Sequence, residues 1–251
     1  MAGTEKTRDR LYQELARKLL ADFSNGDYRP GDRLPAEREL SQTYKVSRPT
    51  VREAIIALEV QGIVEVRVGS GAYLKQLPDQ LPESDFGISA FELTEARLLV
   101  EGETAALAAS QISDEELERL EEILAEIARE NEVNEGAENA DREFHLTIAR
   151  ATRNAALAQM VENLWTLRAQ SPESALLHAK ARTANVKPVV DEHTAILGAL
   201  RTRKPAAARK AMRAHLSAVM ESLLFATEER AIAQARQASQ SKRNRYAGAL
   251  D

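Results

Sequence analysis

Three histidines and one aspartate lie on the apolar faces of predicted helices, and side chains of these types can bind a metal ion. Asp141 and His145 stand four residues apart in ENADREFHLTIARATRN and therefore share one helix face. His193 and His215 lie on the apolar sides of two later helical patterns. Imidazole nitrogens and carboxylates are normal ligands of divalent cations, but a single buried histidine is more often a hydrogen-bonded core residue. A metal site and a packed core are therefore both open on the residues alone.

A second group of residues, at the start of a predicted helix, is suited to DNA. Ser47 fits the N-cap of this helix. Arg48 and Arg52 are expected together on its exposed face, where a guanidinium can donate two hydrogen bonds to guanine, worth about 1–3 kcal/mol of discrimination. The hydroxyls of Ser47 and Thr50, with the free amides of the helix start, suit phosphate. The alternative is the solvated face of an ordinary small domain.

Residues 1–75 have the pattern of a winged helix-turn-helix domain. Helices are expected at 8–25, at 37–44 and from Arg48 to near Gly62, followed by an alternating strand, IVEVRV, a GSG turn and a returning strand, AYLKQ. In helix-turn-helix proteins the second helix of the motif enters the major groove. Arg38 on the preceding helix, and Arg67 and Gly69 at the hairpin turn, are further candidates for DNA contact.

The remainder of the chain is predicted to be helical. Residues 76–90 contain two prolines, several acids and no clear periodicity, which favours a linker. Residues 91–235 show a succession of about six amphipathic helical patterns, which indicates an all-α antiparallel bundle. Ser113 and Glu116 are expected to form a capping box, Asn154 is expected to cap a helix over 154–170, and a further helix is expected near 184–202. Residues 236–251 are expected to form a disordered tail. The predicted fold class is mainly α, with an N-terminal domain of three helices and a β-hairpin and a C-terminal helical bundle.

The composition is typical of a mostly helical protein of two domains. The 251 residues include no Cys, which excludes disulfides, Cys-based zinc modules and thiol nucleophiles. The net charge is −5, but residues 1–75 hold 13 Lys and Arg against 11 Asp and Glu, or +2, and the remainder holds 21 against 28, or −7. A net charge of +2 on residues 1–75 does not by itself indicate a nucleic-acid-binding domain. The DNA hypothesis therefore depends on how the charged residues are arranged. No apolar run reaches the roughly 18 residues of a membrane span, and we expect a cytoplasmic protein without a membrane partner.

The stretch PGDRLPAERELSQTYKVSRPTVREAIIALEVQGIVEVRVGSGAYL resembles the DNA-binding domain of GntR-family transcription regulators. The resemblance is continuous and includes the LPAEREL and SRPTVREA blocks. It implies that Arg38, Arg48 and Arg52 contact double-stranded operator DNA, together with residues of the wing tip. Some relatives carry a histidine before the wing glycine, where this chain has Val68, so Arg67 is the expected substitute there.

Residues 91–225 resemble the FCD domain of the FadR subfamily. Metal-binding members of that subfamily carry an Asp-x3-His pair followed by two single histidines on later helices, and Asp141, His145, His193 and His215 match all four positions. The resemblance therefore implies a bound divalent metal. Zinc is the expected ion, with nickel and manganese as alternatives, because oxygen and nitrogen ligands discriminate weakly among these ions.

The same resemblance implies an acidic effector. Arg97 matches an arginine that FCD regulators use to hold such effectors, and guanidinium can pair with a carboxylate through two hydrogen bonds. A salt bridge to Glu101 is the alternative use of Arg97, and Trp165 is assigned to the core. The segments FELTEARLLVE and LWTLRAQSPESALLHAKA resemble hexuronate-responsive regulators of the UxuR and ExuR type, which favours a sugar acid such as a hexuronate. The candidate effector-binding residues are Arg97, Glu101, Asn163, Arg168 and His178.

We therefore expect a metal-dependent transcriptional regulator, a repressor that a carboxylate effector releases from its operator. A homodimer is expected because helix-turn-helix proteins usually read pseudo-palindromic half-sites. Two alternatives remain open at this point: a helical metalloenzyme that uses the Asp/His site to activate water, and a DNA-binding protein whose metal is structural. No catalytic residues are predicted, because an enzyme would not explain the SRPTVRE segment.

Overall fold

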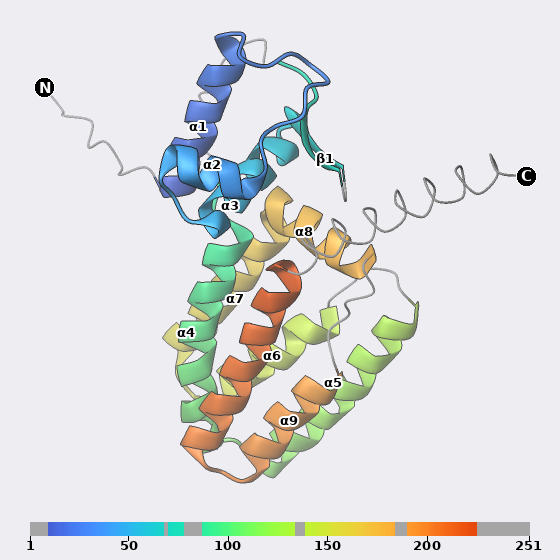
Figure 1. The fold of residues 1–251 in the computed structure, drawn as a ribbon. Coiled ribbons are helices and arrows are strands. Elements are labelled where there is room, and N and C mark those ends of the chain that lie inside the picture. Colours follow the sequence, from blue (N-terminus) through green and yellow to red (C-terminus); the bar gives the residue numbers. More distant parts are fainter. Residues whose placement is uncertain (1–9, 68–69, 78–86, 134–138, 184–189, 225–251) are drawn as a thin grey trace, which may run out of the picture. The chain divides into compact units, whose positions relative to one another are not determined.

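The computed structural model describes residues 10–67, 70–77, 87–133, 139–183 and 190–224, and these residues form two compact units divided between Ser89 and Ala90. Figure 1 traces the helices and strands of each unit. The first unit holds three helices and a two-stranded hairpin, and the regular elements described in the second are all helices. The predicted fold class is confirmed.

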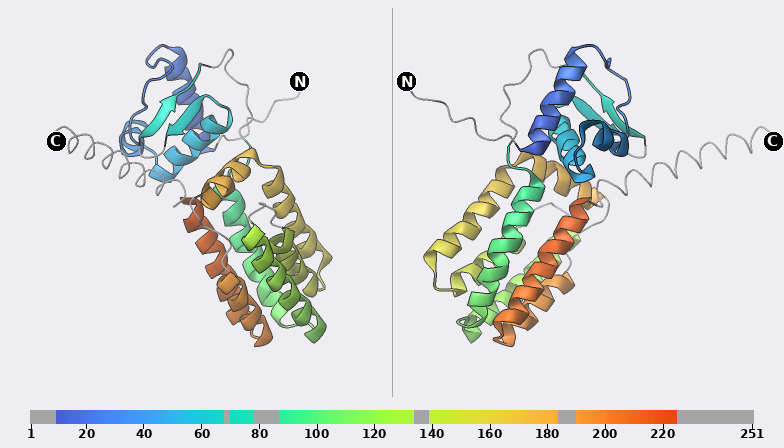
Figure 2. Two further views of the ribbon diagram at one scale, coloured as in Figure 1. Left: turned by 90° about the vertical axis from the view of Figure 1, so that its right-hand side faces the viewer. Right: turned by 60° about the vertical axis from the view of Figure 1, so that its left-hand side comes forward.

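The first unit is built from α1 (Leu11–Ser24), α2 (Glu37–Tyr44), α3 (Arg48–Val60), β1 (Val64–Arg67) and β2 (Gly71–Leu74). The two strands are antiparallel, with Val64 opposite Leu74 and Arg67 opposite Gly71, and Figure 2 shows this hairpin from two further directions. Lys45 adopts a left-handed conformation, φ 56°, at the end of α2, which redirects the chain toward α3. One apolar core joins these elements, with Leu15, Leu19, Phe23, Val51, Leu58 and Leu74 among its members.

A side-chain hydrogen bond and a proline fix the start of α3. The Ser47 hydroxyl accepts a hydrogen bond from the Thr50 amide at 3.2 Å, and Pro49 occupies the opening turn, where its missing amide hydrogen costs nothing. On the face of α3 that points away from solvent, Val51 and Leu58 are fully buried. Capping and burial together orient the first turn of α3, which bears the predicted DNA-binding residues.

The second unit contains α4 (Ala90–Ala109), α5 (Asp114–Val133), α6 (Asn139–Ala151), α7 (Ala155–Gln170), α8 (Pro172–Thr183), α9 (Val190–Arg201) and a further helix over residues 205–224. Two of the predicted caps are present. Ser113 and Glu116 exchange the two hydrogen bonds of a capping box at the start of α5, and the Asn154 side chain accepts two amides at the start of α7.

Helix α8 was not expected from the sequence. Its signal is nevertheless present, because Pro172 suits a first helical position and the Ser171 hydroxyl accepts the Ser174 amide at 3.1 Å. The helix predicted to begin near residue 184 is described only from Val190 onward, and the predicted tail, 236–251, lies outside the described residues.

Helix α6 has two buried faces, and this explains why a polar side chain lies in the interior. Phe144 and Ile148 belong to the main core of the second unit, whereas Leu146 packs in a smaller cluster with Trp165 of α7. His145, between these faces, is only 1% exposed. The main core also takes residues from α4, α5, α9 and the 205–224 helix, including Ala105, Ala108, Leu120, Leu197 and Leu216.

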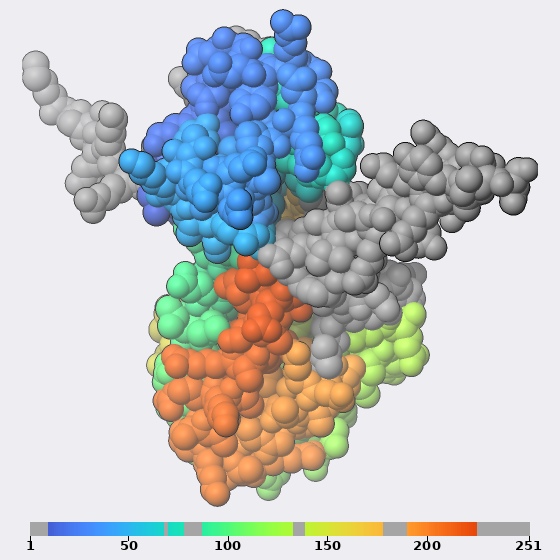
Figure 3. All heavy atoms as spheres, viewed as in Figure 1, coloured from blue at the N-terminus to red at the C-terminus, as the bar shows by residue number. Residues whose placement is uncertain are grey.

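Side chains of α9 and the 205–224 helix cover one face of this unit, coloured orange to red in Figure 3. Within the part of the chain that the structure describes, no helix is both long enough and apolar enough to cross a membrane.

Candidate functional site

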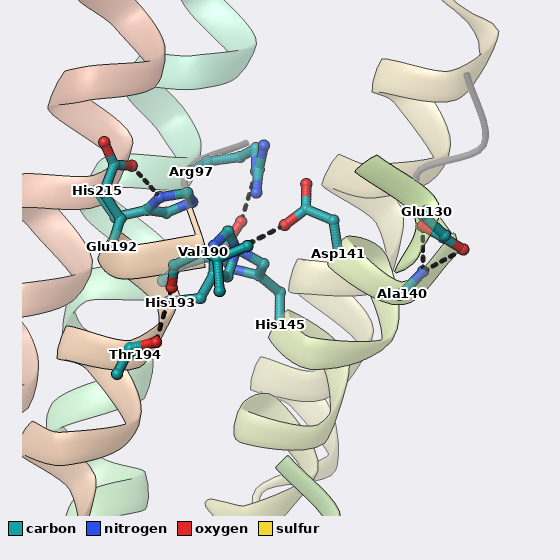
Figure 4. A network of polar contacts seen from close by, with 11 residues as sticks. Arg97, Glu130, Ala140, Asp141, His145, Val190, Glu192, His193, Thr194 and His215 are labelled. Atoms are coloured by element: carbon teal, nitrogen blue, oxygen red, sulfur yellow. Dashed lines mark hydrogen bonds and ion pairs between the residues drawn. The ribbon is translucent and has the colours of Figure 1, made fainter. Parts of the chain in front are cut away.

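The structure brings together the four residues that the sequence singled out as metal ligands. Asp141 and His145 come from α6, His193 from α9 and His215 from the 205–224 helix. All four are buried, and one candidate ligand atom from each lies within 4.8 Å of the others. Figure 4 shows these side chains reaching toward one another from three helices.

Asp141 is shared between two of the imidazole rings. Its Oδ1 atom lies 2.9 Å from Nε2 of His193 and 3.5 Å from Nε2 of His145. The His193 and His215 ring centroids are 4.5 Å apart, and those of His145 and His215 are 5.3 Å apart. The side chains therefore face a common centre from three helices, so the three rings belong to one cluster and not to separate core positions.

Two further carboxylates contact the outer edges of the cluster. Glu101 of α4 contacts Nδ1 of His145 through one oxygen and pairs with Nε of Arg97 at 2.6 Å through the other. Glu192 of α9 lies 2.8 Å from Nδ1 of His215. Because both carboxylates can only accept hydrogen bonds when ionised, the Nδ1 atoms of these two rings are the donors.

Burial and charge act against each other on the ionisable groups. Burial would raise the pKa of the Glu101 carboxyl, but the charges of Arg97 and His145 outweigh it and lower that pKa to about 2. Burial would likewise raise the pKa of Asp141, but its close contacts with the His145 and His193 rings hold that pKa well below its usual range. The cluster therefore contains buried carboxylates that are ionised at neutral pH.

The pKa values of two of the imidazoles are shifted in opposite directions. Burial opposes a charge on His145, yet Glu101 and Asp141 outweigh it and raise its pKa. Burial lowers the pKa of His215 to about 4, although its hydrogen bond to Glu192 opposes that shift. His215 is therefore neutral at pH 7, the form in which an imidazole offers a lone pair to a cation.

The donor set fits a divalent cation. Nε2 of His145 is buried and has no hydrogen-bond partner among the described residues, which is costly for a polar atom in the interior. Two ligands bound at about 2.1 Å to one ion are at most about 4.2 Å apart, so the observed spread of 4.8 Å must contract by at least about half an ångström when an ion binds. Three imidazoles and one carboxylate suit zinc, nickel or manganese, and this set does not select among them.

Arg97 is buried beside this cluster, with 3% of its side chain exposed. The salt bridge to Glu101 is present, but it is a buried pair and not a surface one. The Arg97 guanidinium carbon lies 4.1 Å from the centroid of Trp165, and that of Arg168 lies 4.8 Å from the same ring. Nη2 of Arg97 and Nε1 of Trp165 are buried without hydrogen-bond partners in the described ranges. Unused donors thus gather close to the Asp/His cluster.

The other candidate effector residues differ in their placement. Asn163 is exposed on α7, whose buried face carries Val161 and Trp165. Glu101 has both carboxylate oxygens engaged by the protein. His178 belongs to α8, but its side chain lies outside the described residues.

The predicted DNA-binding residues occupy the first turn of α3 and its surroundings. Ser47, Arg48 and Arg38 are exposed, and Thr50 is partly exposed. The Arg48 side chain is 59% exposed, and its Nη2 atom lies 3.8 Å from Glu37. These side chains can meet a polyanion from solvent without rearrangement of the core.

Arg52 departs from the exposed position expected for it. Its side chain is only 8% exposed, and Nε and Nη2 donate to the two carboxylate oxygens of Glu37 at 3.0 and 2.9 Å. This pair joins α3 to α2, and it was not anticipated because the two residues are 15 positions apart. The Arg52 guanidinium therefore already has an anionic partner in the protein.

The hairpin places Arg67 at the end of β1, where it is exposed. Its guanidinium donates to Glu65 at 2.9 Å and lies 4.5 Å from the centroid of the Tyr73 ring. Gly69 and Val68, the predicted wing tip, lie outside the described residues.

Fold and site together define a protein with a helix-turn-helix unit and a helical unit that holds a buried Asp/His cluster. Two family models match these units: "Bacterial regulatory proteins, gntR family" matches residues 11–74, and the FCD domain matches residues 92–218. The chain therefore belongs to the GntR family of bacterial regulators and carries an FCD domain, as the sequence resemblance implied. It is a transcription regulator and not an enzyme.

Two sequence relatives across most of the chain agree with this assignment. The Exu regulon transcriptional regulator of Escherichia coli (strain K12) is 41% identical over 215 residues, which cover 82% of this chain and 82% of the relative. The Uxu operon regulator of Haemophilus influenzae is 37% identical over 222 residues, which cover 86% of this chain and 82% of the relative. The solved structure of Streptococcus agalactiae GntR is 28% identical and covers 84% of this chain and 99% of that chain, with a TM-score of 0.43.

Sequence reasoning did not identify two of the acids that contact candidate site residues. Glu192 immediately precedes His193, and Glu37 lies within the LPAEREL block beside Arg38. An acid next to a candidate ligand was the available signal, but acids are frequent in this chain. Only the packing of helices shows which of them turn inward.

Proposed function

We propose that this chain is a metal-dependent repressor whose affinity for operator DNA is lowered by a sugar-acid effector such as a hexuronate. The main support is the buried cluster of Asp141, His145, His193 and His215, next to an Arg97 guanidinium that retains an unused donor within the described structure. The names of the relatives, regulators of an Exu regulon and of a Uxu operon, favour the same class of effector.

Asp141, His145, His193 and His215 are the residues proposed to hold the ion, with zinc expected and nickel or manganese as alternatives. When bound, a divalent ion supplies a positive charge that attracts an effector carboxylate. The protein's own contribution is a dry and rigid setting, since all four side chains are buried.

Arg97 is proposed as the main protein contact of the effector carboxylate. Its Nε is held by Glu101, which leaves Nη2 as a donor of fixed direction. Arg168 is proposed to add positive charge from α7, because both guanidinium groups lie close to the Trp165 ring. A carboxylate that reaches this position would meet charge-assisted donors away from bulk water, where they are strongest.

For DNA we propose that the N-terminal turn of α3 enters the major groove. Arg48 reads base edges, the Ser47 and Thr50 hydroxyls contact phosphate, and Arg38 and Arg67 add cationic contacts from α2 and the hairpin. Arg52 is proposed to stabilise this surface through its ion pair with Glu37. If the Arg52 guanidinium also contacts DNA, it must divide its donors between Glu37 and the DNA.

Several finer features complete the proposal. A homodimer would match two operator half-sites. Regulation follows from linkage, because an effector that binds better to the DNA-incompetent state must weaken operator binding by its differential affinity. A regulator of this kind acts where the operator is, in the cytoplasm. The domain boundaries at residues 75 and 91 stay predictions.

The test is an operator titration, followed by fluorescence anisotropy, with metal-loaded and chelator-treated protein. Added hexuronate should weaken operator binding by about 5- to 150-fold in the metal-loaded protein, the range typical of allosteric coupling. Arg97→Lys should retain operator binding and lose most of the response, since lysine lacks the planar donor pair. Operator binding that no sugar acid changes, in protein shown to hold metal, would instead favour a purely structural metal.

A further inference from the structure

Two of the three imidazoles in the cluster are held from outside by acids that are not themselves candidate ligands. Glu101 of α4 contacts Nδ1 of His145, and Glu192 of α9 contacts Nδ1 of His215 at 2.8 Å. Figure 4 shows the Glu192 contact on the side of the ring away from Asp141. The same arrangement, carboxylate to outer ring nitrogen, thus occurs twice and is supplied by different helices.

Each of these contacts determines what the inner nitrogen can do. An ionised carboxylate accepts but does not donate, so the proton of the ring must be on Nδ1, and the lone pair of the neutral ring is then on Nε2. For His145 this is the buried Nε2 without a hydrogen-bond partner among the described residues, 3.5 Å from Oδ1 of Asp141. The acid selects the tautomer and also fixes the orientation of the ring.

We propose that Glu101 and Glu192 are positioning residues that turn Nε2 of His145 and of His215 toward one metal ion. This inference rests on the proposed metal function and adds two residues to the site. It also gives Glu101 a role other than effector contact, because its oxygens are divided between Arg97 and His145.

The two acids differ in how far they can be changed without loss of the fold. Glu101 is 2% exposed and its charge is balanced by Arg97, so its removal would leave a buried guanidinium without a partner. The Glu192 side chain is 28% exposed and contacts His215 through one oxygen. Glu192→Gln is therefore the safer variant, and Glu101→Gln is the conservative change at the buried position.

The experiment measures the affinity of the full-length protein for zinc(II) and cobalt(II), each by competition with a chelator of known strength, and the visible spectrum of the cobalt(II) form. The variants are Glu101→Gln and Glu192→Gln. His215→Ala serves as a loss-of-ligand reference. Glu103→Gln is the matched control, because Glu103 shares α4 with Glu101 but is 53% exposed and pairs with Arg209 at the surface.

We expect both positioning variants to bind either metal about 10- to 100-fold more weakly, the usual effect of removing an acid behind a metal-bound histidine. Their cobalt(II) spectra should be altered, whereas Glu103→Gln should match the wild-type protein. If the wild-type protein binds neither metal, the proposed function and this inference both fail. If the wild-type protein binds and both variants bind equally tightly, only this inference is overturned. Lower thermal stability of the metal-free variants with unchanged metal affinity would also overturn it, since that result assigns the acids a structural role alone.

Discussion

Arg48 and Arg52 are expected to have different roles in the DNA-binding unit, one in operator binding and one in stability, and mutation can separate these roles. Both are predicted DNA contacts, yet the Arg48 side chain is 59% exposed and that of Arg52 only 8%. We predict that Arg52→Ala mainly lowers the free energy of unfolding of this unit. Arg48→Ala should mainly lower operator affinity.

The magnitude follows from the contacts. Arg52 donates two charge-assisted hydrogen bonds to Glu37 at 3.0 and 2.9 Å, and breaking a fully buried pair costs about 3–5 kcal/mol. The Glu37 side chain is 34% exposed and can be rehydrated, which reduces the expected cost of Arg52→Ala to about 2 kcal/mol, or roughly 30-fold in the folding equilibrium. The weak 3.8 Å pair of Arg48 with Glu37 contributes at most about 1 kcal/mol to stability.

The assays are urea denaturation and operator titration of the same purified variants. Arg48→Ala should weaken operator binding by about 5- to 150-fold, the effect of losing one good base contact. Glu37→Gln and the double variant with Arg52→Ala complete a double-mutant cycle. The two changes should be strongly non-additive in stability, with a coupling of about 1–2 kcal/mol, because they remove the same interaction.

One pattern of results would refute this reasoning. If Arg52→Ala leaves the urea midpoint unchanged and abolishes operator binding, and Glu37→Gln does not weaken operator binding, then the Arg52 guanidinium reads DNA directly. The Arg52–Glu37 ion pair would then form only in the DNA-free protein and would not stabilise the unit.

Three further predictions concern stability. Saturating zinc should raise the unfolding free energy of the wild-type protein by about 2.7 kcal/mol at 100 times the dissociation constant; His193→Ala should show no such gain, and an equal gain in both would contradict the assigned ligands. Phe144→Ala should destabilise the helical unit by about 3–5 kcal/mol in urea melts, since Phe144 is fully buried, whereas Leu99→Ala, at a 55% exposed position on α4, should cost less than about 0.5 kcal/mol. Burial and a hydrogen bond to Asp22 raise the pKa of Tyr44 above its ordinary 10.0, so the neutral phenol is favoured in the folded state. That stabilisation is present below pH 10 and is lost as pH rises above it, so the wild-type protein should lose stability there more steeply than Tyr44→Phe, and parallel pH profiles would count against the contact.

What the sequence determined by itself was local. Periodicity located the helices other than α8, and Ser47, Ser113 and Asn154 marked three helix starts through hydrogen bonds that span two or three residues. The i, i+4 spacing of Asp141 and His145 placed both on one face without reference to any other helix. The resemblance to GntR-family regulators then supplied the fold and the expectation of a shared site.

The tertiary structure decided which distant side chains meet. Glu101 contacts a histidine 44 residues away, and Asp141 a histidine 52 residues away. The Arg52–Glu37 pair, the burial of Arg97 against Trp165 and the exposure of Asn163 depend likewise on how helices rotate about their axes when they pack. An amphipathic pattern specifies the apolar face of a helix, but not which polar residue at its edge will be enclosed by a neighbour. That choice is made only when all the helices bury their apolar faces together.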